Sequence, residues 1–529
     1  PYPYFIDYVT EKLLAKYSED MVFKGGLRVF TTLDPKIQSH TEATLANANN
    51  LPPSTTVDGI VQPQAAVVVI DHRNGFIRAI AGGREHTHKR QWNRATNTTR
   101  PPGSAFKPVT AYGPAVEFLG KGPASVVDDI PKSYPSHPQA YTPKNSDGSY
   151  KGLITYREAV RRSVNVAAVE VLSKVGVKDS LDFATKLGIS TFHSSDQGLG
   201  IALGGLHTGV TPLELAGAYG AFANNGTYME PIVITKIESK EGEVLENIVP
   251  QKRKVMKETT AYLITDMLKS VIQGGTGTSA NIGRPAAGKT GTSDDNKDLW
   301  FAGYTTDLTC VVWVGYDEPK RIPNAFGGTY AAPIWATVMR QAHVGVPVRD
   351  FTQPEGIVVA TVDSKSGLKP GPLTPEEHLV TDKFARGTVP SEVDNTHVLV
   401  EVCAVSGKLP TPNCRERITK IMVDLPYKVP DKVADFGIRV PSEYCDVHQG
   451  PQAPNGEENG NGSEGGGEEN NGGNGDWNGG DPGNNGNDND GSPGNGGGDG
   501  SGDTNGDTNG NNGDSQGADG INPDHWWLK

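Results

Sequence analysis

A serine and a lysine lie three residues apart in RPPGSAFKP, where Ser104 and Lys107 follow a Pro-Pro-Gly turn. A serine hydroxyl is a poor nucleophile at neutral pH and needs an adjacent base to remove its proton. On a helix this spacing places both side chains on one face, and a helix that begins at Ser104 directs backbone N–H groups toward the attacking oxygen. The pair alone is a weak signal, because Ser366 and Lys369 repeat the spacing in a Gly- and Pro-rich stretch that cannot hold a helix.

Two later motifs add the other groups that such a nucleophile needs. Ser163 and Asn165 precede an Ala/Val-rich helical stretch, where either residue could also be an ordinary N-cap. The segment GKTGT places Lys289 and two hydroxyls next to apolar strand residues, which is unusual unless something lies against that edge. The lysine and the hydroxyls could bind a carboxylate, and Gly291 would let a substrate backbone approach closely. The two hydroxyls belong to Thr290 and Thr292.

The three motifs occur in a fixed order along the chain. S-x-x-K, S-x-N and K-T-G follow one another, with 59 residues from Ser104 to Ser163 and 126 from Ser163 to Lys289. In this order they form the active-site set of penicillin-recognising serine enzymes. Together they predict an acyl-transfer site, provided that the chain folds so that the three segments meet.

The elements that must position these motifs alternate between helices and strands. Residues 5–14, which follow a Pro/Tyr-rich entry, and residues 35–46 have helical patterns, and GLRVFTTLD between them is typical of a short strand. Residues 65–83 contain two apolar runs about an Arg-Asn-Gly turn, and residues 298–317 contain a second such pair. Strands joined by tight turns form antiparallel sheets, so we expect an α+β fold with helices flanking an antiparallel sheet.

Composition divides the chain into four parts. Residues 1–60 are predicted to lead into a catalytic domain at 61–345, which a small β-rich appendage follows at 350–448. Within the appendage, VATVDSKSGLKP and LVEVCAVSGKLP share the pattern V-x-x-x-S-G-x-x-P, a weak internal repeat. Residues 449–529 consist almost entirely of Gly, Asn, Asp, Ser and Glu, which cannot form an apolar core, and are predicted to be a disordered tail.

The charge distribution limits the possible partners. Residues 451–529 hold 15 of the 62 acidic residues and one of the 49 basic residues, so the remaining 48 basic and 47 acidic residues nearly balance. No broad basic surface for nucleic acid is therefore predicted. No apolar run reaches the length of about 18 residues that a membrane span needs, so the chain is either soluble or a fragment without its anchor.

The four cysteines fall into two groups. Cys310 lies in the apolar run TCVVWVGY and is predicted to be a small buried hydrophobic residue. Cys403, Cys414 and Cys445 lie late in the chain, near His448. A disulfide between Cys403 and Cys414 would suit an exported protein, whereas three cysteines and a histidine could bind zinc. Their spacing matches no defined zinc motif, so the sequence by itself predicts neither a metal nor a cofactor.

Longer stretches resemble one protein family closely. NRATNTTRPPGSAFKP, GGLHTGVTPLELAGAYGAFANNG, GGTGTSANIGRPAAGKTGT and DLWFAGYT resemble the transpeptidase domain of class A, bifunctional penicillin-binding proteins. PYFIDYV and GLRVFTTLDPKIQ resemble the segment that joins the glycosyltransferase domain to it. The resemblance spans residues 3–345 and implies the penicillin-binding/β-lactamase-like fold. Neither a glycosyltransferase domain nor an anchor precedes Pro1, so the chain resembles a C-terminal fragment of such a protein.

The resemblance also implies catalytic roles. Ser104 would attack the carbonyl of the penultimate D-Ala in a peptidoglycan stem peptide that ends in D-Ala-D-Ala, and Lys107 would accept its proton. Ser163 would relay the proton to the departing amine beside Lys289. Asn165 would orient Lys107 and hydrogen-bond the substrate amide.

The implied substrate contacts come from the K-T-G strand. The backbone N–H groups of Ser104 and Thr292 would form the oxyanion hole, and the hydroxyls of Thr290 and Thr292 would hold the terminal carboxylate. An amine of a second stem peptide would then attack the acyl-enzyme and form a cross-link, whereas a β-lactam would stall as a stable acyl-enzyme. The parent protein would be anchored at the extracytoplasmic face of the bacterial cell membrane, with the cell-wall synthesis machinery.

Two other functions remain open at this level. A D,D-carboxypeptidase or β-lactamase would use water in place of the amine; class A β-lactamases carry Ser-Asp-Asn and a deacylating glutamate, whereas Val164 takes the middle position here. A non-catalytic wall-binding or β-lactam-sensing module would not need Ser104, Lys107 and Lys289, and all three are present. We therefore expect a D,D-transpeptidase.

Overall fold

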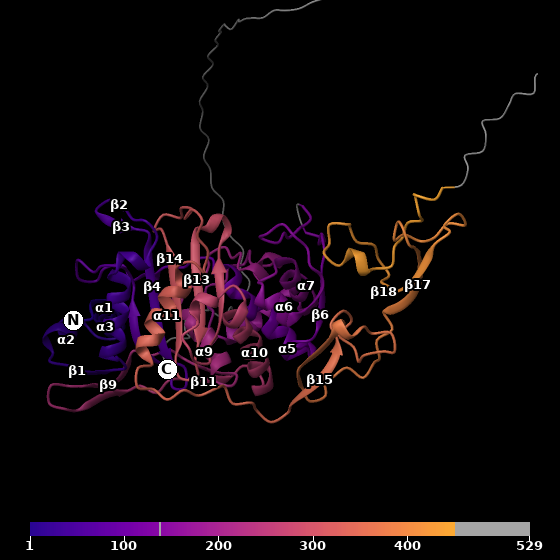
Figure 1. Cartoon of the computed structure of the whole chain (residues 1–529). Coiled ribbons are helices and arrows are strands. Elements are labelled where there is room, and N and C mark those ends of the chain that lie inside the picture. Colours follow the sequence, from indigo (N-terminus) through magenta and orange to yellow (C-terminus); the bar gives the residue numbers. More distant parts are fainter. Residues whose placement is uncertain (137–138, 450–529) are drawn as a thin grey trace, which may run out of the picture. The chain divides into compact units, whose positions relative to one another are not determined.

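A five-stranded antiparallel sheet lies at the centre of the computed structural model, which describes residues 1–136 and 139–449. Its strand order is β12-β13-β14-β4-β5, and Figure 1 shows β13, β14 and β4 side by side. The predicted tail lies outside the described residues from position 450 onward. The five strands are β4 (Gln64–Asp71), β5 (Phe76–Ala81), β12 (Ala287–Thr292), β13 (Asp298–Tyr304) and β14 (Thr309–Gly315).

Both faces of this sheet are buried, because its side chains alternate between two apolar cores. Val67 and Val69 of β4 point into one core, whereas Val68 and Ile70 point into the other. Helices α3 (Pro35–Ala46) and α11 (Ala331–Ala342) cover the first face. Helices α9 (Pro212–Ala223) and α10 (Glu258–Gly274) cover the second face and connect it to a helical region. The predicted α+β fold is therefore confirmed.

The remaining helices surround the site or pack at the edges of the sheet. They are α1 (Pro3–Leu14), α2 (Glu19–Lys24), α4 (Arg94–Asn97), α5 (Gly113–Leu119), α6 (Tyr156–Arg161), α7 (Asn165–Val175) and α8 (Val177–Lys186). None of the helices in the described part of the chain is both long and apolar enough to cross a membrane.

Short strands complete the catalytic part of the chain as small antiparallel sheets. Strands β1 and β10 flank β9, and the other strands form the pairs β2–β3, β6–β7 and β8–β11. Their bounds are β1 (Arg28–Thr31), β2 (Thr55–Val57), β3 (Ile60–Gln62), β6 (Val126–Asp129), β7 (Gly152–Thr155), β8 (Thr227–Met229), β9 (Ile234–Glu238), β10 (Val244–Asn247) and β11 (Lys252–Lys254).

Local sequence signals account for several element boundaries. Strands β4 and β5 form the predicted antiparallel hairpin, and Gly75 in its turn has a φ of 75°, which favours glycine. Helix α9 begins with a capping box. The Thr211 hydroxyl accepts from the Glu214 backbone N–H, and the Glu214 carboxylate accepts from the Thr211 backbone N–H. Asp34 caps α3 in the same region where the sequence predicts a helix start.

The segment that carries Ser104 is less regular than the predicted helix. A 3₁₀ turn, η2 (Gly103–Phe106), is followed by a π-helical turn at Pro108–Tyr112, and regular α-helix begins only at α5. Pro108 lacks an N–H and cannot take part in a continuous α-helical ladder, while its carbonyl accepts from Gly113. Lys107 therefore follows Ser104 by one turn of a 3₁₀ helix.

Residues 1–60 pack on the catalytic part of the chain. Phe5 and Tyr8 of α1 lie in the same core as the helical region, and Ile37 and Leu45 of α3 lie in the opposite core. The predicted division at residue 350 stays a prediction.

The region predicted as a β-rich appendage contains two antiparallel strand pairs, β15–β16 and β17–β18. Arg157 donates to the carboxylate of Asp382 on β16 and to the backbone carbonyl of Asp266 on α10. These contacts tie the first strand pair to α6 and α10. The strands are β15 (Ile357–Asp363), β16 (Leu379–Ala385), β17 (His397–Cys403) and β18 (Arg417–Val423).

Candidate active site

The three sequence motifs meet at the edge of the central sheet. Lys107 Nζ donates to the Ser163 carbonyl at 2.6 Å and to Asn165 Oδ1 at 2.7 Å. Lys289 Nζ, from β12, donates to Ser163 Oγ at 2.8 Å, and Lys107 Nζ lies 3.2 Å from the same hydroxyl. Ser163 therefore bridges two amines that come from opposite sides of the site.

Ser104 precedes Lys107 by one turn and lies against the K-T-G strand. Gly103 has a φ of 55°, and a Cβ at this position would lie 2.3 Å from the Thr292 carbonyl oxygen. The Ser104 side chain is half-buried, and its hydroxyl makes no hydrogen bond within residues 1–136 and 139–449. The hydroxyl is thus partly open to solvent and has no protein partner among the described residues.

Gly291 lies in close contact with the segment that carries Ser104. A Cβ at Gly291 would lie 2.3 Å from the Pro102 carbonyl oxygen and 3.0 Å from Ala105 Cβ. Such separations are too short for non-bonded atoms, so the absence of a side chain lets the Ser104 turn dock on β12. The segment that carries Ser104 therefore lies against this edge of the sheet.

Burial controls the charge of both lysines. Neither side chain is exposed to solvent. Burial, and secondly the charge of Lys289, hold the pKa of Lys107 well below its ordinary value of 10.5, against the opposing effect of Asp129. Burial lowers the pKa of Lys289 to about 7. The lowered pKa of Lys107 favours its neutral amine, which is the form that accepts a proton.

Ser163 adopts a backbone conformation that few non-glycine residues adopt. Its φ is 58°, and this left-handed conformation costs about 1–3 kcal/mol for such a residue. Backbone bonds from Ser163 N to Val160 O and from Val164 N to Ala159 O hold the turn. The strained turn orients the Ser163 hydroxyl toward the two amines.

The interpretation of Ser163 or Asn165 as an ordinary N-cap is wrong. Val164 is the N-cap residue of α7 and makes no side-chain capping bond. Asn145, 20 residues upstream, takes over this role: its Oδ1 accepts from the backbone N–H groups of Asn165 at 2.9 Å and Val166 at 3.1 Å. The Asn165 side chain is thereby free to accept from Lys107.

Asn145 and Asp129 are two site residues that the sequence reasoning missed. Asn145 Nδ2 donates to Asp129 Oδ1 at 2.7 Å, and the Lys151 backbone N–H donates to Asp129 Oδ2 at 2.7 Å. Burial raises the pKa of the Asp129 carboxyl, although these hydrogen bonds oppose the shift. Asn145 lies in the loop segment KNSDG, where a polar residue is common, and no local signal marks it.

The two threonines of the K-T-G strand have partners of their own. Thr290 Oγ1 lies 2.7 Å from Thr276 Oγ1, and Thr292 Oγ1 accepts from the Gly327 N–H at 3.1 Å. A cleft of about 510 Å³ opens beside Ser163, between the turn after α6 and the end of α10. It is lined by polar and charged residues, including Asn145, Lys151, Arg161, Arg162, Ser163 and Thr276.

Two family matches cover most of the described chain. The penicillin-binding protein transpeptidase domain matches residues 65–340, which contain all three motifs. The C-terminal domain of penicillin-binding protein 1A matches residues 353–399.

Curated relatives are similar over most of this chain. Penicillin-binding protein 1A of Clostridium botulinum is 37% identical over 425 residues, which cover 76% of this chain and 51% of that protein. Penicillin-binding protein 1F of Bacillus subtilis is 35% identical over 377 residues, covering 69% and 50%, respectively. The chain thus spans about half the length of the curated relatives it matches.

Solved structures share the fold. Penicillin-binding protein 1A from Haemophilus influenzae aligns with a TM-score of 0.63 and 23% identity, over 74% of this chain and 77% of that chain. The PonA1 protein of Mycobacterium tuberculosis, solved in complex with penicillin V, aligns with a TM-score of 0.58 and 27% identity, over 67% and 96%. The chain therefore belongs to the penicillin-binding protein transpeptidase family, as its motifs predict, and carries the transpeptidase domain of that family.

Proposed function

We propose that Ser104 is the nucleophile that is acylated by a stem peptide ending in D-Ala-D-Ala. Its Oγ forms a bond with the carbonyl carbon of the penultimate D-Ala, and its proton passes to the neutral amine of Lys107. As the tetrahedral intermediate collapses, the C–N bond breaks and a proton reaches the departing D-Ala amine through the Ser163 hydroxyl. An ester between Ser104 and the shortened peptide remains.

The hydrogen-bonded chain from Lys107 through Ser163 to Lys289 is the observation that carries this proposal. A hydroxyl between two amines can accept a proton from one side while it donates one on the other, so it suits a relay. The lowered pKa of Lys107 favours the neutral amine that would act as the base. Asn165, which accepts from Lys107 at 2.7 Å, would hold that amine in place.

The K-T-G strand supplies the substrate contacts in this proposal. The Thr292 backbone nitrogen lies beside Gly103, where a Cβ would be 2.8 Å from it. In this proposal the backbone N–H groups of Thr292 and Ser104, the residue after Gly103, form the oxyanion hole together. Lys289, Thr290 and Thr292 would bind the terminal carboxylate of the stem peptide, and Gly291 keeps their strand against the nucleophile.

An amine of a second stem peptide would complete the reaction. Its nitrogen attacks the Ser104 ester, the new amide forms the cross-link, and the serine regains its proton. The polar cleft beside Ser163 would give peptide segments access to the ester. A β-lactam follows the acylation half and remains bound, because its ring-opened product blocks the incoming amine.

The setting of this reaction is also a proposal. Peptidoglycan stem peptides are cross-linked outside the cytoplasm, so the chain would act at the extracytoplasmic face of a bacterial cell membrane, with other cell-wall synthesis proteins. The parent protein would carry an anchor and a peptidoglycan glycosyltransferase domain, as the resemblance implies.

Labelling with a fluorescent penicillin tests the assignment. We expect one labelled peptide, with the label on Ser104, and no label on the folded Ser104→Ala variant. Ser366→Ala, which alters the other S-x-x-K sequence, is the matched control and should label like the wild type. Full labelling of Ser104→Ala would overturn the proposal. A stem-peptide analogue with an added amine then separates transfer from hydrolysis, because only transfer makes the amide product.

A further inference from the structure

Residues 357–448 contain two copies of one structural unit, which the weak sequence repeat indicates. Each copy begins with a pair of seven-residue antiparallel strands, β15–β16 and β17–β18. After the first strand of each pair the chain makes the same turn: the N–H of Asp363 donates to the Leu368 carbonyl, and that of Cys403 to the Lys408 carbonyl, both at 2.9 Å. The V-x-x-x-S-G-x-x-P pattern therefore marks equivalent backbone positions.

Later contacts extend this equivalence to four positions. The N–H of Asp394 donates to the Lys369 carbonyl at 2.7 Å, and that of Cys445 to the Leu409 carbonyl at 2.8 Å. The four positions are Asp363, Thr374, Asp394 and His397 in the first copy and Cys403, Cys414, Cys445 and His448 in the second. In both copies the first two of these residues are 11 positions apart in the sequence, and the last two are three positions apart.

In the first copy these positions bind one another through hydrogen bonds. His397 Nδ1 lies 2.7 Å from Asp394 Oδ2 and 3.3 Å from Asp363 Oδ2. Thr374 Oγ1 donates to Asp394 Oδ2 at 3.1 Å. His397 Nε2 is also paired, with Nδ1 of His378 at 2.9 Å. The polar groups of the first copy thus satisfy each other at the centre of the unit.

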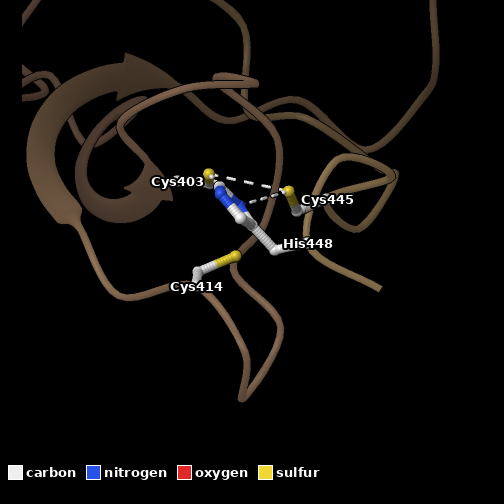
Figure 2. Close-up of side chains that lie close together, drawn as sticks. All are labelled: Cys403, Cys414, Cys445 and His448. Carbon is white, nitrogen blue, oxygen red and sulfur yellow. Dashed lines mark hydrogen bonds between the residues drawn. The ribbon is translucent and has the colours of Figure 1, made fainter. Parts of the chain in front are cut away.

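In the second copy, three thiols and an imidazole converge at the equivalent place, as Figure 2 shows. Cys403 Sγ lies 3.6 Å from Cys445 Sγ, and His448 Nδ1 lies 3.4 Å from each of these two sulfurs. The four ligand atoms, including Cys414 Sγ, lie within 4.8 Å of one another. The four cysteines of the chain are unpaired, and the three in this cluster are buried.

The separations among Cys403 Sγ, Cys445 Sγ and His448 Nδ1 are those of a tetrahedral metal site. Zinc binds thiolate sulfur at about 2.3 Å and imidazole nitrogen at about 2.0–2.1 Å. A tetrahedron with these bonds has edges of about 3.8 Å between sulfurs and about 3.5 Å between sulfur and nitrogen. The observed 3.6 Å and 3.4 Å match those edges. The donor set of three cysteines and one histidine is also a recurring structural zinc set.

The surroundings of Cys414 fit a metal-bound thiolate. The Thr411 N–H donates to Cys414 Sγ at 3.3 Å, and in the first copy the Gly371 N–H donates to Thr374 Oγ1 at 2.8 Å. In each copy, the backbone N–H three residues before this position donates to its side chain. Hydrogen bonds of this kind orient a ligand and stabilise its negative charge.

We propose that Cys403, Cys414, Cys445 and His448 form a structural zinc site. Each thiol loses its proton on binding, and the ion closes the second copy in place of the hydrogen bonds of the first. A unit of this size has little apolar surface to bury, and its three cysteines form a buried cluster of their own. Because protein atoms fill all four positions, the site stabilises the fold and leaves none open for catalysis.

Metal analysis of the purified chain tests this proposal. We expect about one zinc ion per chain in protein grown with zinc and purified without chelators. Cobalt(II) added to the metal-free protein should produce the thiolate-to-metal absorption of a tetrahedral site. Cys445→Ser should lose most of the zinc, and His448→Ala should release it faster to a chelator.

Asp394→Asn is the matched control, because Asp394 occupies the first-copy position that corresponds to Cys445. It should keep the zinc content of the wild type. Penicillin labelling of Ser104 in each variant reports whether the catalytic part is folded, and His448→Ala carries the test if Cys445→Ser does not fold. Protein that binds neither zinc nor cobalt, or a disulfide among these cysteines in non-reducing peptide maps, would overturn the proposal.

Discussion

Substitution of Gly291 by alanine tests whether the K-T-G strand must lie directly against the nucleophile turn. The added Cβ would lie 2.3 Å from the Pro102 carbonyl oxygen, 2.9 Å from Trp300 Cβ and 3.0 Å from Ala105 Cβ. Non-bonded carbon and oxygen atoms do not approach so closely, so the turn and β12 must separate by about 1 Å. None of these three atoms is the far end of a flexible side chain, so the backbone has to move.

Two effects with different magnitudes follow from this separation. Overpacking at a buried site destabilises a protein by about 1–3 kcal/mol. Alanine also lowers the conformational entropy of the unfolded chain, which stabilises the folded state by about 0.4–1 kcal/mol and offsets part of this loss. We therefore expect a modest fall in melting temperature. A displacement of about 1 Å between a nucleophile and its partners can reduce the rate about 100-fold, so acylation should suffer far more than stability.

The second-order rate of acylation by a fluorescent penicillin and the melting temperature are the two measurements. Gly198→Ala is the matched control, because a Cβ there meets no atom within 4 Å and Gly198 has a φ of −101°. It should leave the acylation rate unchanged and raise the melting temperature slightly, because alanine restricts the unfolded chain. A folded Gly291→Ala variant that is acylated at nearly the wild-type rate would show that the close contact between η2 and β12 is not needed for the reaction.

Two further predictions concern the buried lysine pair and the asparagine beside it. The folded pKa of Lys289, about 7, lies below its ordinary 10.5, so the unfolded state binds more protons between these values. From this lysine alone, stability should therefore rise with pH in this window by at most about 1.4 kcal/mol per pH unit. Lys289→Met should lose this contribution and show a shallower slope of melting temperature against pH, whereas equal slopes in both proteins would contradict the lowered pKa of Lys289. Asn145→Ala removes the cap of α7 and should cost about 1–2 kcal/mol; it should also slow acylation, since Asn165 loses its support, and unchanged values of both would show that solvent replaces the cap.

Several elements of the fold could be predicted because their signals are local. The hairpin of β4 and β5 follows from two apolar runs and a turn with glycine at a positive φ. Helix α3 follows from an apolar pattern and the Asp34 cap, which bonds to Lys36 and Ile37. In each case the interacting residues lie within a few positions of one another.

The irregular start of the Ser104 helix was not predicted. The spacing of Ser104 and Lys107 indicates a helix, but the choice between α, 3₁₀ and π turns depends on how the segment packs. The Gly103 backbone is held against Thr292, a residue almost two hundred positions later. Contacts of that range leave no local pattern.

The types of the proposed reacting groups were determined by the sequence alone, because a candidate nucleophile, base and carboxylate-binding strand are recognised from side chains and their order. Their arrangement was decided by the tertiary structure. The capping of α7 by Asn145 and the fit of Gly291 against Pro102 both join segments that are far apart in the chain. So does the convergence of Cys403 with Cys445 and His448. Such contacts depend on close packing, in which shifts of about 1 Å matter, and no periodicity along a chain encodes distances at that scale.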